Sequence, residues 1–186
     1  MVKRDEPDTR ERMLDAVEKL MVTGGYPAVT YRAVAAEVGV TGGSVQYYFP
    51  TLDDLLTAAI RRRVDQNVAR LADALDDATN PLRVLWDYSS GEAQQAITHE
   101  FMALANHRKS IKAEIGEGVR RVRDLEFAAL DGAGPPGTEL ALSRRAMVFL
   151  VTGIPKLLQM EGDVGIDHGH AEIVAELEQW IDAQRK

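Results

Sequence analysis

Apolar residues recur at spacings of three and four along most of the chain, and this period constrains the fold more than any other feature of the sequence. The first such stripe consists of Met13, Leu14, Val17, Leu20 and Met21. Gly24 and Gly25 end it. A spacing of three and four places side chains on one face of an α-helix, whereas strands need strict alternation, and neither a convincing alternating stretch nor an Asn-Gly hairpin turn occurs. The sequence therefore predicts an all-α fold.

Successive helices are separated by residues that favour turns and helix ends. Thr30 and Thr41 can each cap a short helix, and Gly39 between them can adopt the positive φ of a helix end. Thr51, with Asp54 three residues later, begins a long amphipathic helix that extends to about residue 78. Further helices are predicted at about 81–88, 92–107, 109–131, 139–161 and 170–184.

Residues 30–50, TYRAVAAEVGVTGGSVQYYFP, match the requirements of a helix-turn-helix. This motif needs a small residue where its helices cross, a residue that tolerates positive φ at the turn, and an apolar residue on the inner face of the second helix. Ala35, Gly39 and Val45 meet these needs at spacings of four and six. The other buried positions are expected to be filled by Val34, Val38, Val40 and Tyr48. An ordinary αα-hairpin shows the same pattern, so the motif favours DNA binding without requiring it.

The charge distribution refines this interpretation. Lys and Arg total 22 against 29 for Asp and Glu, and a net charge of -7 argues against nonspecific binding to polyanions. However, residues 1–63 hold nine basic and nine acidic side chains, so the whole excess of acid lies after them. Residues 38–52 carry no charged side chain at all. A surface without carboxylates can approach phosphates, which favours DNA as the partner of this segment.

On these residues the chain resembles the TetR family of bacterial transcriptional regulators. The resemblance rests on RERMLDAVEKLMVTGGY, VTYRAVAAEVGVTGGSVQYYF and LDDLL in the family's order and spacing, and it covers about residues 8–60. It implies an N-terminal three-helix DNA-binding domain at residues 1–52 and a C-terminal helical bundle for effector binding and dimerisation at residues 53–186. It further implies a ligand-responsive regulator that binds a near-palindromic double-stranded DNA operator as a homodimer. Members of the family usually repress transcription, so a repressor is expected. A small, largely apolar effector would release it.

The resemblance also implies that residues 41–48 enter the major groove, next to contacts from the preceding helix. The DNA-binding candidates are Thr30, Tyr31, Arg32, Thr41, Gly42, Gly43, Ser44, Gln46, Tyr47 and Tyr48. Their hydroxyl groups suit phosphate oxygens, while Arg32 suits a guanine edge or a phosphate, and Gln46 suits an adenine edge. Tyr48 is expected to lie mostly in the core.

Two positions depart from the family pattern. Gln46 stands where the family commonly has an aromatic residue, and Leu52 stands where it commonly has a lysine that contacts phosphate. Leu52 is expected to pack against the protein instead. The basic run Arg61–Arg63 lies three helical turns from Leu52, and we interpret it as a solvated helix face or as a source of ion pairs between domains.

The two functions implied for the C-terminal part have weaker support in its residues. A dimer interface is predicted at Phe149, Leu150, Ile154, Leu157, Leu158, Ile173, Leu177, Trp180 and Ile181, for which ordinary core packing is the alternative. The effector candidates mix aromatic, soft and hydrogen-bonding groups and are Trp86, Tyr88, His99, Phe101, Met102 and Asn106. Each of these six residues also fits a role in the core or on the surface.

The sequence contains no motif that indicates an enzyme or a membrane protein. The chain has no cysteine, and the HExxH-like start at His99 fails because residue 103 is Ala, so neither a metal nor another cofactor is predicted. The charged N-terminus lacks the apolar region of a signal peptide, and the longest apolar run, residues 146–155, is about half the roughly 20 residues that span a bilayer. We therefore expect a cytoplasmic protein that is not an enzyme. The alternatives are a helical interaction module with a vestigial helix-turn-helix and a small-molecule enzyme in the C-terminal bundle.

Overall fold

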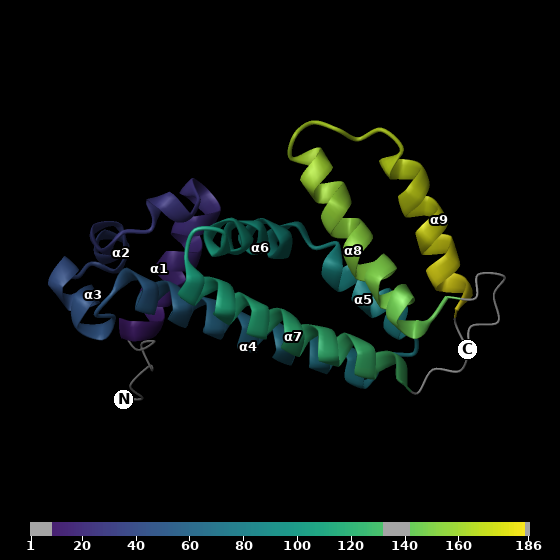
Figure 1. The fold of residues 1–186 in the computed structure, drawn as a ribbon, viewed down its shortest axis with the longest axis horizontal. Helices are drawn as coiled ribbons and strands as arrows, with labels where there is room; N and C mark the ends of the chain where they lie inside the picture. The colour runs from purple at the N-terminus through teal and green to yellow at the C-terminus, as the bar shows by residue number, and fades with distance from the viewer. Residues whose placement is uncertain (1–8, 132–141, 185–186) are drawn as a thin grey trace, which may run out of the picture. The chain divides into compact units, whose positions relative to one another are not determined.

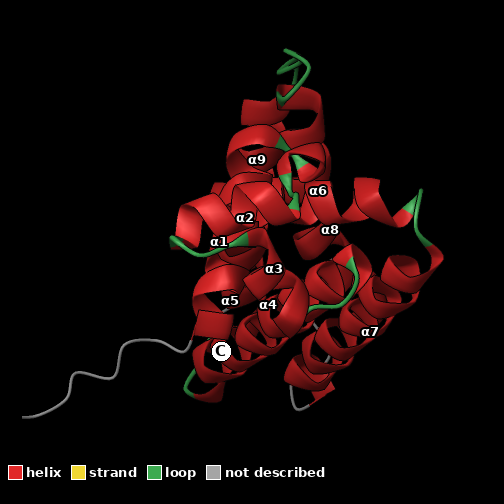
Figure 2. Cartoon of the chain, turned by 90° about the vertical axis from the view of Figure 1, so that its left-hand side faces the viewer, coloured by secondary structure: helices red, strands yellow, loops and turns green. Residues whose placement is uncertain are grey.

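A computed structural model describes residues 9–131 and 142–184, and all regular structure within these ranges is helical (Figures 1 and 2). The elements are α1 Thr9–Gly24, the 3-10 turn η1 Tyr26–Ala28, α2 Tyr31–Val38, α3 Gly42–Tyr48, α4 Leu52–Asp76, α5 Pro81–Ser89, α6 Glu92–Ala105, α7 Lys109–Asp131, α8 Arg144–Gly162 and α9 His170–Ala183. The predicted all-α fold is confirmed. Residues 139–141, where a helix was predicted to begin, lie outside the described residues.

The hydrogen bonds expected at the predicted helix ends are present. Thr30 Oγ1 accepts the Ala33 amide at 3.1 Å, and Thr41 Oγ1 accepts the Ser44 amide at 3.2 Å. Gly39 ends α2 with φ 76°, a left-handed conformation that glycine adopts without steric cost. Thr51 and Asp54 form a reciprocal capping box at the start of α4, with bonds of 2.9 Å and 3.1 Å.

The chain divides into two compact units. Unit 1 contains the described residues up to Asp65 together with Ala96–Val119, and unit 2 contains Gln66–Gln95 together with the described residues from Arg120 onward. The divisions fall inside α4, α6 and α7, so three continuous helices contribute to both units. These divisions do not coincide with the boundary predicted between residues 52 and 53, which was drawn by function and stays a prediction.

Unit 1 consists of α1–α3 (Figure 1), the first part of α4 and the segment Ala96–Val119. One buried cluster holds it together, with Met13, Leu14, Val34, Val45, Leu55 and Ile60 from the N-terminal helices. The later segment adds Ile97, Phe101, Leu104 and Ile111 to the same cluster. The helix-turn-helix is therefore supported by residues that come about fifty positions later in the sequence.

Unit 2 has its own apolar core. In this unit α5 packs mainly against α8 and also contacts α9. The buried core residues are Leu71, Leu82, Leu85, Trp86, Leu130, Met147, Val148, Val151 and Ile181. Asn80 caps α5 by accepting the Arg83 amide and donates its own side-chain N–H to the Ile181 carbonyl at 2.9 Å, so a buried polar side chain joins α5 to α9. Among the described residues, no helix combines the length and apolar composition that crossing a membrane requires.

Candidate nucleic-acid interface

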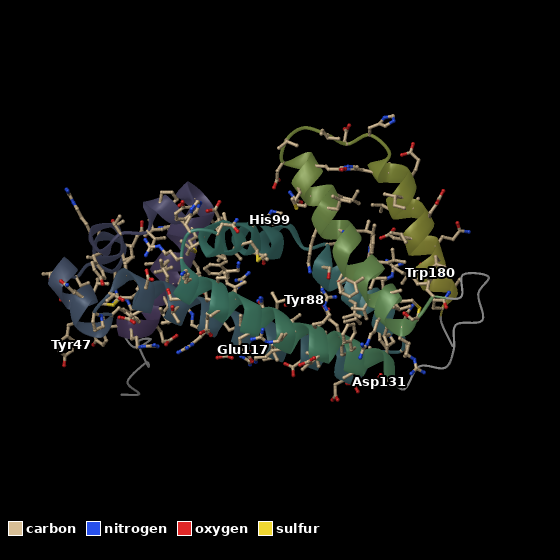
Figure 3. All side chains as sticks on the ribbon, in the orientation of Figure 1. Tyr47, Tyr88, His99, Glu117, Asp131 and Trp180 are labelled. Atoms are coloured by element: carbon tan, nitrogen blue, oxygen red, sulfur yellow. The ribbon has the colours of Figure 1, made fainter. Side chains whose placement is uncertain are left out.

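The short helix α3 is anchored on one side and open on the other. Val45 is fully buried and Phe49, the residue that ends the helix, is 3% exposed. Tyr47 is 84% exposed, and Figure 3 shows its side chain pointing away from α3. Gln46 is also exposed. The helix thus presents polar, uncharged side chains on an outer face while its inner face fixes its position.

The expectation that Tyr48 lies mostly in the core is wrong, because Tyr48 is 40% exposed. Val45 and Phe49 are four residues apart and share the inner face, whereas Tyr48, three residues from Val45, falls at the edge of that face. Its ring meets the Tyr47 ring edge-on, with centroids 5.7 Å apart. Both tyrosines therefore belong to the exposed surface of α3.

The first turn of α3 combines two hydroxyl groups with two glycines. Thr41 Oγ1 and Ser44 Oγ lie 2.9 Å apart at the start of the helix. A Cβ on Gly42 would meet no atom within 4 Å, and one on Gly43 would meet only Thr41 Oγ1, at 3.8 Å. Neither glycine has a positive φ. The internal packing of unit 1 therefore does not explain the absence of side chains at these positions.

The start of α2 contributes one exposed side chain and one internal contact. Arg32 is exposed. Tyr31, in contrast, donates its hydroxyl to the Phe49 carbonyl at 2.8 Å, and burial together with the charge of Asp54 raises the pKa of this hydroxyl. Tyr31 was predicted to contact DNA, but the structure gives its hydroxyl a partner at the end of α3. It connects the two helices of the motif.

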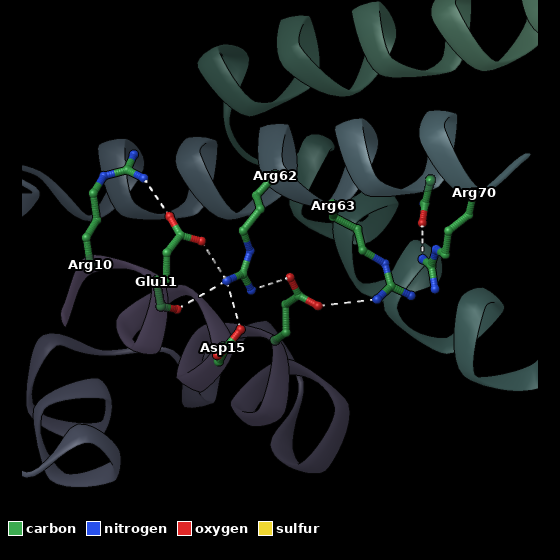
Figure 4. A network of polar contacts seen from close by, with 8 residues as sticks. Arg10, Glu11, Asp15, Arg62, Arg63 and Arg70 are labelled. Carbon is green, nitrogen blue, oxygen red and sulfur yellow. Dashed lines mark hydrogen bonds and ion pairs between the residues drawn. The ribbon is translucent and has the colours of Figure 1, made fainter. Parts of the chain in front are cut away.

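In the basic run Arg61–Arg63, Arg62 and Arg63 form ion pairs with α1, which lies on the other side of the predicted boundary at residues 52 and 53, rather than a solvated face (Figure 4). Arg62, only 14% exposed, places its guanidinium among the carboxylates of Glu11, Asp15 and Glu18 on α1, at 3.3, 2.8 and 2.8 Å. Arg63 contacts Glu18 at 3.3 Å. These ion pairs lie within unit 1 and fasten α1 to α4. The neighbouring Arg61 is exposed and contacts Glu114 of α7 at 2.8 Å.

The junction between α3 and α4 holds a contact that sequence reasoning missed. Leu52 packs against the core of unit 1, as expected. Its neighbour Asp53 accepts hydrogen bonds from Arg108 and from Ser110, the latter at 2.7 Å between Ser110 Oγ and Asp53 Oδ2. These bonds hold the pKa of the Asp53 carboxyl below its ordinary value, Ser110 being the largest cause. No local signal could have identified Arg108, because 55 residues separate it from Asp53.

The six effector candidates are divided between the units. Trp86 is buried in the core of unit 2, where its Nε1 donates to Glu178 at 3.2 Å, and Tyr88 is partly buried there. The other four, His99 (labelled in Figure 3), Phe101, Met102 and Asn106, belong to unit 1, where Phe101 is a core residue and Met102 is 50% exposed. The structure therefore does not bring the six together in one unit, and their role in effector binding stays a prediction.

A hollow of about 220 Å³ lies between α1 and α2. It is lined by Arg12, Asp15, Ala16, Lys19, Glu37 and Val38. Most of these side chains are charged, and Lys19 pairs with Glu37 across it at 2.6 Å. This lining does not suit an apolar effector. No group of three or more His, Asp or Glu side chains that could hold a metal ion occurs in the part of the chain that the structure describes.

The predicted dimer residues differ in exposure. Phe149 and Leu157 of α8 are 58% and 49% exposed. Leu150, Leu158 and Ile173 are half-buried. Ile154, Leu177 and Trp180 pack against the core of unit 2, and Ile181 is fully buried in it. Ile181 is thus a core residue, because its side chain has no surface left for a partner.

Comparison with known proteins points to the same segment as the motif. Residues 13–59 match the family described as "Bacterial regulatory proteins, tetR family". The chain is 34% identical over 93 residues to the HTH-type transcriptional regulator BetI of Stenotrophomonas maltophilia, a match that covers 48% of this chain and 47% of BetI. It is 39% identical over 61 residues to the HTH-type transcriptional repressor KstR of Rhodococcus jostii, which covers 33% of this chain and 29% of KstR. The matches thus span less than half the length of these relatives.

A solved structure extends the likeness to nearly the whole chain. The crystal structure of the multidrug binding protein EbrR, complexed with imidazole, superposes with a TM-score of 0.62 at 26% identity, over 92% of this chain and 96% of EbrR. The family match is limited to residues 13–59, whereas the similarity in fold extends over 92% of the chain.

Proposed function

Because the chain belongs, through residues 13–59, to the TetR family of bacterial regulatory proteins, we propose that it is a transcriptional repressor whose helix α3 reads an operator. The observation that carries the proposal is the two-sided character of α3. Val45 and Phe49 fix the helix in the core, while Tyr47 is 84% exposed on a helix that has no charged side chain. A recognition helix needs both properties, since it must enter the major groove in a fixed orientation.

The candidate contacts follow from exposure and chemistry. Tyr47 and Gln46 extend from the outer face of α3, and Arg32 extends from α2. The hydroxyls of Thr41 and Ser44 suit phosphate oxygens or base edges. Thr30, Gly42, Gly43 and Tyr48 remain in the proposed interface as well. Tyr31 contributes to it by holding α2 against the end of α3.

Substitution of Tyr47 tests the proposal. The wild-type protein first selects its preferred duplex from a random-sequence DNA library. Tyr47→Ala and Arg32→Ala are each expected to lower affinity for that duplex roughly tenfold or more, as expected for loss of a direct contact. The control is Val22→Ala, which truncates an apolar side chain of α1 that is 59% exposed. If the Tyr47 and Arg32 variants bind as tightly as the Val22 variant, α3 is not the reading helix.

Dimerisation through α8 is the second part of the proposal. Phe149, Gly153, Leu157 and Met160 follow one another at spacings of four, four and three on this helix. Phe149, Leu157 and Met160 are all at least 49% exposed, and a Cβ on Gly153 would meet no atom within 4 Å. The same stripe of a second copy can pack against it about a two-fold axis. Two recognition helices would then meet half-sites about 34 to 36 Å apart.

A charged side chain within this stripe tests dimerisation. Phe149→Asp and Leu157→Asp are expected to shift the protein to a monomer in sedimentation equilibrium, and to weaken binding to a two-half-site duplex. Val119→Asp, at a 51% exposed residue of α7, is the control. A dimer that persists in both stripe variants at the wild-type dissociation constant would exclude this interface.

Release by a small, largely apolar effector is the third part. The support for a small ligand is the likeness to the multidrug binding protein solved with imidazole, at 26% identity, while the apolar character is proposed from the candidate residues. The candidate residues remain Trp86, Tyr88, His99, Phe101, Met102 and Asn106. Because coupling is reciprocal, a compound that lowers DNA affinity must bind the DNA complex more weakly by the same factor. Compounds that bind the free protein can be found because they raise its melting temperature. The effector is the one that also releases the selected duplex, and a stabilising compound without this effect is not the effector.

A further inference from the structure

The junction between α3 and α4, residues Phe49–Asp53, lacks a cation of its own. Residues 38–52 carry no charged side chain, and Leu52 packs into the core of unit 1. The first charged residues after the recognition helix are Asp53 and Asp54, both acidic. Asp53 is only five residues after Tyr48, which limits their Cα atoms to at most about 18 Å apart. Asp53 and Asp54 are therefore the charged residues nearest along the chain to the end of the proposed reading helix.

The fold brings two arginines to this junction from distant parts of the sequence. Arg108, in the connection between α6 and α7, forms an ion pair through Nη1 with Asp53 Oδ1. Arg10 of α1 places its guanidinium 5.3 Å from the centroid of the Phe49 ring. The side chains of Arg108 and Asp53 are 35% and 38% exposed, so their pair lies at the surface of unit 1.

The chemistry of the pair leaves Arg108 suited to a second anion. A guanidinium presents five N–H donors in a planar fork, and the bond to Asp53 uses Nη1. Ser110 donates to the other carboxylate oxygen at 2.7 Å, so Asp53 is held by two partners. Arg108 thus lies at the junction beside a carboxylate that Ser110 also holds, and its remaining donors match a phosphate oxygen pair.

We propose that Arg108 contacts a backbone phosphate of the operator beside the α3–α4 junction while it stays paired with Asp53. This inference rests on the proposed function, since it names a further contact of the same DNA interface. Leu52 provides no cation at this junction, and the tertiary structure brings one there in Arg108, 55 residues after Asp53. The alternative role of the pair is a tie that only fastens the α6–α7 segment to α4.

Two substitutions that break the same ion pair separate these roles. A structural tie predicts that Arg108→Gln and Asp53→Asn change DNA affinity in the same direction. A phosphate contact predicts opposite directions, because Arg108→Gln removes a cation facing DNA while Asp53→Asn removes a carboxylate that repels it. We expect Arg108→Gln to weaken binding to the selected duplex roughly three- to tenfold, and to reduce the slope of log affinity against log salt by about one. Asp53→Asn should bind at least as tightly as the wild type.

Three further measurements complete the test. Arg108→Lys should keep most of the salt slope, since it keeps the charge. Arg121→Gln, at an exposed arginine of α7 in unit 2, is the matched control and should keep the wild-type slope. Thermal unfolding of each variant shows whether it is folded. If a variant is not folded, phosphate ethylation interference replaces it: ethylation of a phosphate next to the α3 half-site must weaken binding of the wild type and of Arg108→Lys.

The outcomes are distinguishable from failure of the proposed function. If Arg108→Gln and Asp53→Asn weaken binding equally, or if the salt slope of Arg108→Gln equals that of the wild type, Arg108 is only a structural tie and the inference is wrong. If instead the wild type selects no DNA, or Tyr47→Ala binds normally, the proposed function has failed. Loss of binding in Tyr47→Ala, combined with opposite effects at residues 108 and 53, supports both.

Discussion

Gly118 of α7 leaves the space that Val64 of α4 fills, since a Cβ at residue 118 would lie 2.5 Å from Val64 Cγ2 and 3.3 Å from Cγ1. Gly118→Ala therefore forces α4 and α7 apart within unit 1. We expect a loss of about 1 to 3 kcal/mol in unfolding free energy, despite the better helix propensity of Ala. Val64→Ala in the same chain should remove most of this loss. Urea unfolding of both single variants and the double variant measures the coupling, and additive effects would contradict the contact.

Gly43→Ala should move stability and DNA affinity in opposite directions. Within the protein a Cβ at this position would meet only Thr41 Oγ1, at 3.8 Å, so alanine should stabilise α3 by up to about 1 kcal/mol. A methyl group on the first turn of the proposed reading helix should nevertheless hinder its approach to DNA. Thermal unfolding and binding to the selected duplex test this. In the control Gly162→Ala, at the open end of α8, binding should not change. Unchanged affinity in Gly43→Ala would show that DNA does not approach this turn.

Arg62 should contribute far more to stability than its neighbour Arg61. Arg62→Met leaves Glu11, Asp15 and Glu18 close together without their shared cation, and we expect a loss of about 2 to 4 kcal/mol. Arg61→Met breaks a single exposed pair with Glu114 and should cost at most about 1 kcal/mol. Denaturant unfolding compares the two. Equal losses would mean that the carboxylates of α1 do not depend on Arg62.

Glu126 should make the stability of the protein depend on pH. Its side chain is buried, and burial raises the pKa of its carboxyl above the ordinary value of 4.5, although the nearby charges of Arg123 and Lys156 oppose this. The folded state then binds the proton more tightly than the unfolded state does. The resulting stabilisation is complete below the ordinary value and is lost as pH rises through the raised pKa.

Glu126→Gln isolates this effect. The difference in melting temperature between wild type and variant should change as pH rises above 4.5, in the direction of a less stable wild type. The control is Glu117→Gln, at an exposed residue of the same helix. A difference that stays constant from pH 4 upward would show that Glu126 titrates normally.

Local signals in the sequence were enough to predict the helices and the residues that cap them. The caps at Thr30, Thr41 and Thr51 and the left-handed Gly39 each depend on partners within five residues. Such contacts form wherever the local chain becomes helical, so the pattern of residues predicts them. The family resemblance added the proposed role of α3, which helix periodicity does not contain. Prediction was less successful in the last turn of α3, where Phe49 rather than Tyr48 is buried, because in a helix of seven residues neighbouring positions share the edge of the inner face.

By itself, then, the sequence determined an all-α chain with a helix-turn-helix near its N-terminus and an uncharged outer face on α3. Only the tertiary structure decided which distant residues support that motif. Arg62 reaches the carboxylates of α1, Arg108 reaches Asp53, and Gly118 receives Val64, across separations of 44 or more residues. The physical reason is that charges and side chains act through space over a few ångströms, while the sequence orders residues only along the chain. Which of them come that close is decided when the apolar core assembles.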